Sequence, residues 1–303
     1  MINKSINQNP SNAFAALILF VLIGWISSGL LFAAVASFIP SFIEILNSTA
    51  PQTGDFLRAM VGINLPIMFL LPAIFVANQY QPGQIKKTTS LTNAPTLSAI
   101  ALAVFVIIIS QPALNLIGEW NKQLSLPDSL SSIMQWIKSS EAEAETMSKL
   151  MIETHSTAVL LMNILVIGIL PGICEEFLFR GVIQSIFTDW FKRKHVAVWA
   201  TAFVFSFIHF QFLGFIPRLL LGAMLGYFVL YSGSLWTSIL AHSLNNTLIV
   251  VLSYLQFNHI ISNDIESLGY GNTAWIGVMS IVFSIVIFVY FIKRKIPNSY
   301  KDL

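Results

Sequence analysis

Charged side chains are scarce in this sequence, and so is cysteine. Asp, Glu, Lys and Arg together make up 10% of the 303 residues, whereas soluble domains carry about 25%. The one cysteine, Cys174, can form no disulfide within the chain. The formal net charge of +2 is too small to indicate a nucleic-acid partner. These shortages exclude a water-soluble domain, an internally disulfide-bonded scaffold and a nucleic-acid-binding protein.

Hydrophobic residues are abundant instead, and they occur in long runs. They make up 55% of the chain, and the mean hydropathy is +0.75. Several runs approach the about 20 residues that a helix needs to cross a bilayer. The first run is too long for a secretory signal and lacks a small-residue cleavage site, so we predict a retained helix. The sequence predicts an all-α, polytopic integral membrane bundle of about eight transmembrane helices, at 13–37, 57–78, 97–117, 156–187, 196–213, 215–231, 235–257 and 273–292.

The charges between these spans indicate how the chain crosses the membrane. Lysine and arginine accumulate on the cytoplasmic side, and eight spans put both termini on one side. The segments on that side hold only two acidic residues, Asp189 and Asp302, against Lys4, Lys86, Lys87, Lys192, Arg193, Lys194, Lys293, Arg294, Lys295 and Lys301. The opposite segments are mainly acidic, with Glu44, Asp55, Glu119, Asp128, Glu141, Glu143, Glu145, Glu153, Asp264 and Glu266 against Arg58, Lys122, Lys138, Lys149 and Arg218. We predict a multi-pass protein of the cell (plasma) membrane with both termini in the cytoplasm.

The longest polar stretch, 118–155, follows the third span. Ile133, Trp136 and Ile137 occur there at helical spacing among charged residues, which predicts an amphipathic helix on the outer surface. This helix is either an ordinary connector or a lid that gates substrate entry. We divide the chain into 1–154, with three spans and this outer helix, a core at 155–255, and 256–303, with the last span and a basic tail.

Glu175 and Glu176 are the only acidic residues within a predicted span. A carboxylate in the bilayer core costs about 3 kcal/mol on insertion scales, so such residues normally face the protein interior and serve a function. Arg180 follows Glu176 by four residues and lies on the same helix face. It either pairs with Glu176 and orients it, or contacts a substrate. Pro171 and Gly172, just before the glutamates, are expected to kink or loosen the helix.

Two histidines also lie within predicted spans, His209 in the fifth and His242 in the seventh. Asn246 follows His242 by four residues and shares its helix face. An isolated intramembrane histidine often serves only as an interhelical hydrogen-bonding group. At about 1.5 Å per residue from the cytoplasmic ends, Glu175 lies about 18 Å deep, His209 about 20 Å, and His242 and Asn246 about 10 to 17 Å. We therefore expect these groups to meet in one layer.

Three short motifs carry a resemblance to a known family. Glu175 to Arg180 match Glu-Glu-x-x-x-Arg, Phe205 to His209 match Phe-x-x-x-His, and His242 to Asn246 match His-x-x-x-Asn. In this order, on consecutive membrane helices, they resemble the CPBP family of intramembrane proteases, which includes CAAX proteases and bacteriocin-processing enzymes. The resemblance covers about 155–255.

The resemblance implies an intramembrane endopeptidase that acts on a membrane-associated or lipidated peptide. Glu175 and His209 would activate a water molecule, and His242 and Asn246 would stabilise the oxyanion. Glu176 and Arg180 would support the site, and Phe205 would pack. The family is often described as metalloproteases, so Glu175, His209 and His242 are the ligands if zinc is used. The sequence contains no His-Glu-x-x-His, and we favour the metal-free mechanism, which needs no cofactor.

Two other function classes remain open. In a proton- or cation-coupled transporter, the acids and histidines would relay protons or bind a cation. A transporter, however, predicts polar groups spread along a path, whereas here they cluster in one layer. In a non-catalytic membrane scaffold, changing Glu175 to Gln would leave activity untouched. The expected partners are the lipid bilayer and a membrane-anchored or peptide substrate.

Overall fold

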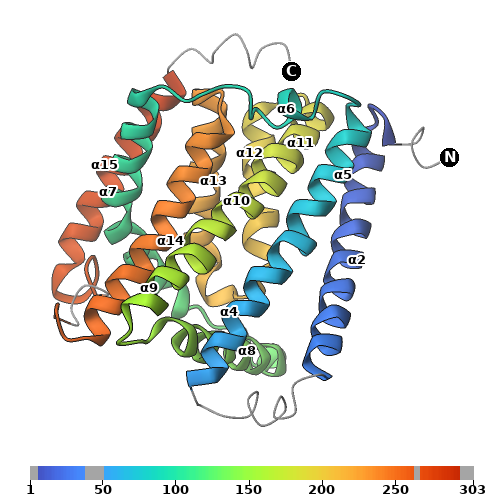
Figure 1. Cartoon of the computed structure of the whole chain (residues 1–303). Coiled ribbons are helices and arrows are strands. Elements are labelled where there is room, and N and C mark those ends of the chain that lie inside the picture. Colours follow the sequence, from blue (N-terminus) through green and yellow to red (C-terminus); the bar gives the residue numbers. More distant parts are fainter. Residues whose placement is uncertain (1–5, 38–50, 263–266, 294–303) are drawn as a thin grey trace.

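The structure is a computed structural model that describes residues 6–37, 51–262 and 267–293, and all regular elements in those ranges are helical (Figure 1). Several long segments are interrupted by π-helical turns, so one membrane span can carry more than one label. The main segments are α2 (Pro10–Ser37), α4 (Pro51–Leu65) with η1 (Pro66–Leu70) and α5 (Leu71–Tyr80), α7 (Leu97–Lys122), α8 (Ser131–Ile152), α9 (Thr157–Asn163) with η3 (Ile164–Ile169), α10 (Leu170–Glu176), η4 (Phe177–Ile183) and α11 (Gln184–Phe191), then α12 (Lys194–Phe207), α13 (Phe215–Ser232), α14 (Leu235–Phe257) and α15 (Ala274–Lys293).

The helices confirm the predicted fold class. Within the described residues, six helical segments are long and apolar enough to cross a membrane, and two shorter apolar helices span Lys194–Phe207 and Gly271–Ile287. Each of the eight overlaps one predicted span. The protein is therefore an integral membrane bundle with about eight transmembrane helices.

The predicted end of the fifth span is wrong. We placed that span at 196–213, but α12 ends at Phe207. The backbone turns there because Phe210 adopts a left-handed conformation, with φ of 53°. No glycine marks this turn in the sequence, so the helix end could not be recognised. His209 consequently lies in the turn beyond α12 and not within the helix.

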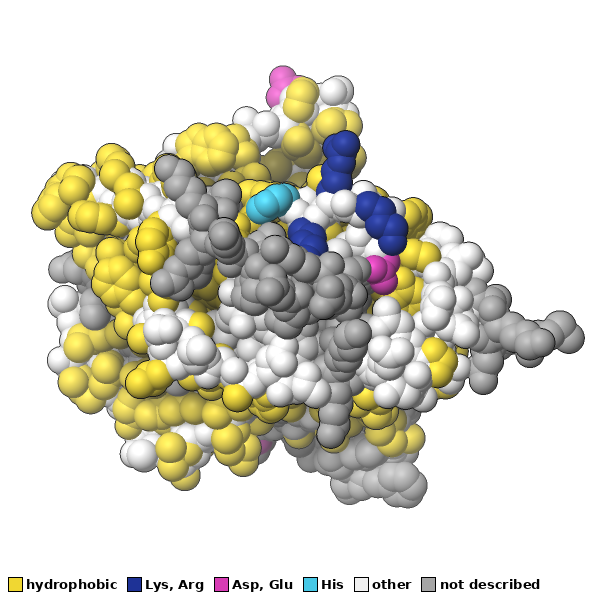
Figure 2. Space-filling model, turned by 90° about the horizontal axis from the view of Figure 1, so that it is seen from above, with side chains coloured by type: hydrophobic (Ala, Val, Ile, Leu, Met, Phe, Trp, Pro, Cys, Tyr) yellow, Lys and Arg dark blue, Asp and Glu magenta, His cyan; other side chains and the backbone are white. Residues whose placement is uncertain are grey.

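The two ends of the bundle differ in composition. Figure 1 shows the start of α2 and the end of α15 at the same end, as an even number of crossings requires. Figure 2, which views this end, shows Lys, Arg and His side chains amid polar atoms and a hydrophobic rim. The connection between α11 and α12 lies here and consists of Lys192 and Arg193, and α12 then begins at Lys194. Several of the charges that we assigned to the two sides lie outside the described residues: Lys4, Glu44, Asp264, Glu266, Arg294, Lys295, Lys301 and Asp302.

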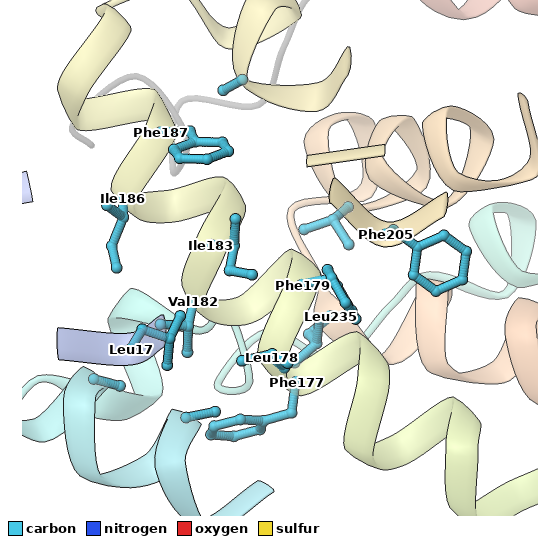
Figure 3. Close-up of a cluster of buried hydrophobic side chains, with 14 of the residues drawn as sticks. Leu17, Phe177, Leu178, Phe179, Val182, Ile183, Ile186, Phe187, Phe205 and Leu235 are labelled. Carbon is cyan, nitrogen blue, oxygen red and sulfur yellow. The ribbon is translucent and has the colours of Figure 1, made fainter. Parts of the chain in front are cut away.

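The outside of the bundle is apolar, as contact with lipid requires. Trp25 on α2 is 62% exposed and Trp275 on α15 is 67% exposed. Lipid tails are as apolar as these side chains, so their exposure carries no penalty in a bilayer. The inside is packed around α10, η4 and α11, where Phe177, Phe179 and Val182 meet residues from other helices (Figure 3).

The predicted amphipathic helix is α8, which runs across the opposite end of the bundle (Figure 1). A buried arginine on α4 fastens its C-terminal end. The Arg58 guanidinium donates to the Met151 carbonyl at 2.5 Å and to Asn163 Oδ1 at 3.4 Å, and it pairs with Asp55 at 2.6 Å. Asn163 Nδ2 donates to the same Met151 carbonyl at 2.8 Å. Two transmembrane segments therefore hold one end of α8.

Replacing Arg58 by Met is expected to loosen this attachment. A hydrogen bond to a charged group contributes about 1.5–3 kcal/mol, so the end of α8 should open about tenfold more often. In detergent, trypsin should then cut after Lys149 about tenfold faster, because cleavage of a helix needs local opening. The control is Glu119→Gln, which removes an exposed ion pair with Lys122 on α7. Equal cleavage rates in Arg58→Met and the parent would show that Arg58 does not hold α8.

Candidate active site

The segment that carries the paired acids is one long helix with two π-helical turns. These turns, η3 and η4, flank α10, which holds Pro171, Gly172, Glu175 and Glu176. The expected loosening near Pro171 therefore takes the form of widened turns, a geometry that is frequent at functional sites. Gly172 lets α10 approach α14, because a Cβ atom at this position would collide with the Ser243 hydroxyl and backbone.

Glu176 lies at the centre of a fully buried cluster of polar groups. Its side chain is 0% exposed, and its Oε1 pairs with Arg180 at 2.5 Å. The same oxygen lies 2.7 Å from His242 Nδ1, and Oε2 accepts a hydrogen bond from Ser238 at 2.5 Å. All of its partners come from its own helix or from α14. With both oxygens engaged by protein groups, Glu176 is suited to orient His242.

Arg180 is held on three sides within the bundle. Besides Glu176, it donates to the Gly222 carbonyl on α13 at 2.9 Å. Its guanidinium also lies over the Phe205 ring, 4.5 Å from the centroid, an arrangement typical of a cation–π contact. The Phe205 ring contacts the His209 and His242 rings edge to face, with centroids 5.0 and 5.8 Å away. Phe205 thus packs among the polar groups, and the Arg180 side chain, 0% exposed, is placed for pairing.

Glu175 and His209 form the second acid–histidine pair. His209 Nδ1 donates to the Phe205 carbonyl at 2.7 Å, which the end of α12 leaves without its usual helical partner. In the neutral ring, Nε2 is then an acceptor, and it faces Glu175 Oε2 at 4.0 Å. Two acceptors at this separation form no hydrogen bond with each other, but one water molecule can donate to both. Glu175 is 8% exposed, whereas the His209 side chain is 28% exposed, so the pair lies where a buried acid meets a half-buried histidine.

Asn246 lies one helical turn beyond His242 on α14. Its Oδ1 accepts a hydrogen bond from Asn245 Nδ2 at 3.2 Å. Among the described residues, no hydrogen bond joins Asn246 to Glu175 or His209. The structure thus places Glu175 beside His209, and Glu176 beside Arg180 and His242. Asn246 is related to these groups by its position on α14, one turn beyond His242.

The fit to zinc can be tested on the donor atoms. Glu175, His209 and His242 are the ligands that the sequence suggested for a metal. His242 Nδ1 is bound to Glu176, and only the Glu175–His209 pair is close. Within the part of the chain that the structure describes, no group of three or more His, Cys, Asp or Glu residues is arranged to hold a metal ion. As placed, these residues do not fit a zinc centre.

Two contributors to the cluster were missed in the sequence. Ser238 precedes His242 by four residues, so Ser238, His242 and Asn246 follow one face of α14. That spacing could have revealed it. The Gly222 carbonyl gave no such signal, because a backbone acceptor is visible only once α13 is packed. Gly222 and Gly226, four residues apart on α13, lie against α12, where a Cβ would meet Phe205 and Val198.

Comparison with known proteins supports the resemblance drawn from the three motifs. Residues 157–248 match the family model "Type II CAAX prenyl endopeptidase Rce1-like". The uncharacterized protein YpbD of Bacillus subtilis (strain 168) is 24% identical over 133 residues, which cover 43% of this chain and 62% of that protein. The alignment thus spans less than two thirds of that relative. No solved structure matches the chain. The resemblance to CAAX proteases is confirmed for the segment that carries both acid–histidine pairs.

Proposed function

Because residues 157–248 match a type II CAAX prenyl endopeptidase, we propose that the chain is an intramembrane endopeptidase that hydrolyses a peptide bond in a membrane-anchored or lipidated substrate. The core at 155–255 would carry the chemistry, and the outer segments would complete the bundle. Basic residues at the end of the bundle that holds the start of α2 suggest that both termini face the cytoplasm of the cell membrane.

The observation that carries the proposal is the facing pair of acceptors, Glu175 Oε2 and His209 Nε2, 4.0 Å apart. A water molecule that donates one proton to each would keep its lone pairs free. During attack on the peptide carbonyl, its oxygen forms the new bond to carbon and Glu175 takes one proton. Glu175 then passes that proton to the leaving nitrogen as the carbon–nitrogen bond breaks. The products are a carboxylic acid and an amine.

The oxyanion formed in this attack needs hydrogen-bond donors, and α14 offers two. His242 Nδ1 donates to Glu176, so Nε2 can donate to the oxyanion only when it carries a proton of its own. Asn246 lies one turn further along the same face and supplies an amide donor. Glu176 and Arg180 would therefore act by orienting His242 and not by touching the substrate.

The mechanism as proposed uses no metal, so a chelator should leave the rate within about twofold of the untreated enzyme. The assay uses purified protein in detergent and a library of membrane-anchored peptides, with and without chelator. The library also identifies which anchor and sequence are cut.

The opposite result would be equally clear. If a chelator abolished cleavage and added Zn²⁺ restored it, the metal-free assignment would be wrong. Glu175, His209 and His242 would then have to rearrange into a ligand set when the metal binds. If cleavage continues in the presence of the chelator, protein side chains and not a metal ion activate the water.

A further inference from the structure

Three amide side chains form a hydrogen-bonded row that ends at Asn246. Gln111 on α7 donates through Nε2 to Asn245 Oδ1 at 3.0 Å. Asn245 in turn donates through Nδ2 to Asn246 Oδ1 at 3.2 Å. Asn245, in the middle of the row, is 5% exposed, and Gln111 and Asn246 are half-buried. It joins α7, which carries none of the three motifs, to α14.

One backbone group fixes the direction of the whole row. Gln111 Nε2 also lies 2.9 Å from the Ile107 carbonyl, an oxygen that can only accept. The NH₂ end of Gln111 must therefore face this site, and Asn245 must present its oxygen to it. Asn245 then has its own NH₂ group for Asn246. Asn246 must accept with its oxygen, which leaves its Nδ2 as a donor.

The row thus determines which end of the Asn246 amide is available to a substrate. If Asn245 were turned over, Asn246 would have to donate to it and would present an oxygen instead. An oxygen in that position would repel a developing oxyanion and not stabilise it. We propose that Gln111 is a positioning residue for hydrolysis, which acts through Asn245 to keep the NH₂ group of Asn246 directed at the oxyanion. This inference rests on the proposed function.

A merely structural role would have different consequences. Polar side chains commonly join transmembrane helices, and Gln111 could serve only to hold α7 against α14. In that case, replacing Gln111 would disturb the packing of the bundle, and its effect on the cleavage rate would be the same with or without the Asn246 amide. A positioning role requires that the effect of Gln111 disappears once Asn246 has no amide.

The test is a double-mutant cycle on the rate of peptide cleavage. Met matches Gln in length and has no amide, so Gln111→Met removes the group that fixes Asn245. We expect kcat to fall about tenfold with KM unchanged, because one hydrogen bond decides between the two amide orientations. In the Asn246→Ala variant, kcat should fall by about 10²- to 10³-fold, the usual effect of losing one oxyanion donor. In the Asn246→Ala background, Gln111→Met should change kcat by less than about twofold.

The control lies one turn along the same helix. Asn115 donates to the Leu268 carbonyl at 3.0 Å and, among the described residues, makes no hydrogen bond to Asn245. Asn115→Ala therefore tests the loss of a neighbouring polar contact on α7 and should keep the parent rate. A tenfold loss from Gln111→Met in both backgrounds would overturn the inference while leaving the proposed function intact. A parent-like rate in Asn246→Ala would overturn the oxyanion role itself, on which the inference rests.

Discussion

Replacing Glu175 by Gln is expected to lower kcat by about 10³-fold or more, while the bundle remains folded. Gln has the same shape but cannot take a proton from water. Among the described residues, the Glu175 carboxylate makes no hydrogen bond, and His209 Nε2, 4.0 Å away, is too distant for one. The variant therefore loses no hydrogen bond that holds helices together. The measurement is cleavage of a membrane-anchored peptide, with thermal unfolding in the same detergent.

A matched substitution of another glutamate separates this effect from a change of charge. Glu143 is exposed on α8, and Glu143→Gln should cleave at the parent rate. His209→Ala should resemble Glu175→Gln in activity, since the water needs both acceptors. If Glu175→Gln and His209→Ala cut as fast as the parent, Glu175 and His209 do not activate the water. A transporter or a non-catalytic scaffold would then be the better explanation of these residues.

The spans were predictable because the ability of a segment to cross a bilayer depends on the residues of that segment alone. About 20 consecutive apolar residues suffice, and each such run of this sequence became a helix. The Glu176–Arg180 pair was predictable for the same reason, since a spacing of four residues brings the two side chains to one face. The widened turn at η4 did not disturb it.

The partner of each histidine was not predictable in the same way. Which acid meets His209 and which meets His242 depends on how closely α10 packs against α12 and α14. The contact with α14 depends on Gly172, whose missing side chain makes room for Ser243. No spacing along one helix contains this information. The turn at Phe210 was likewise hidden, because a left-handed residue other than glycine leaves no clear mark in a sequence.

Glu176 should respond to mutation quite differently from Glu175. In Glu176→Leu, the Arg180 guanidinium, with a side chain that is 0% exposed, loses its counter-charge. Breaking a buried pair by removing one partner costs about 3–5 kcal/mol. Ser238 and His242 lose their acceptor as well. We expect a protein that is poorly folded in detergent, detected as a large fall in unfolding temperature and in yield.

A second substitution tells whether this loss comes from the buried charge. In Glu176→Leu/Arg180→Met both charges are gone, and replacing a whole buried pair by apolar residues is often neutral for stability. The double variant should therefore recover most of the unfolding temperature. It should not recover activity, because His242 Nδ1 would still lack the carboxylate that orients its ring. A folded double variant with the parent rate would show that His242 needs no partner. A folded but inactive double variant would separate the two roles of Glu176: its bond to Arg180 stabilises the bundle, and its bond to His242 is needed for catalysis.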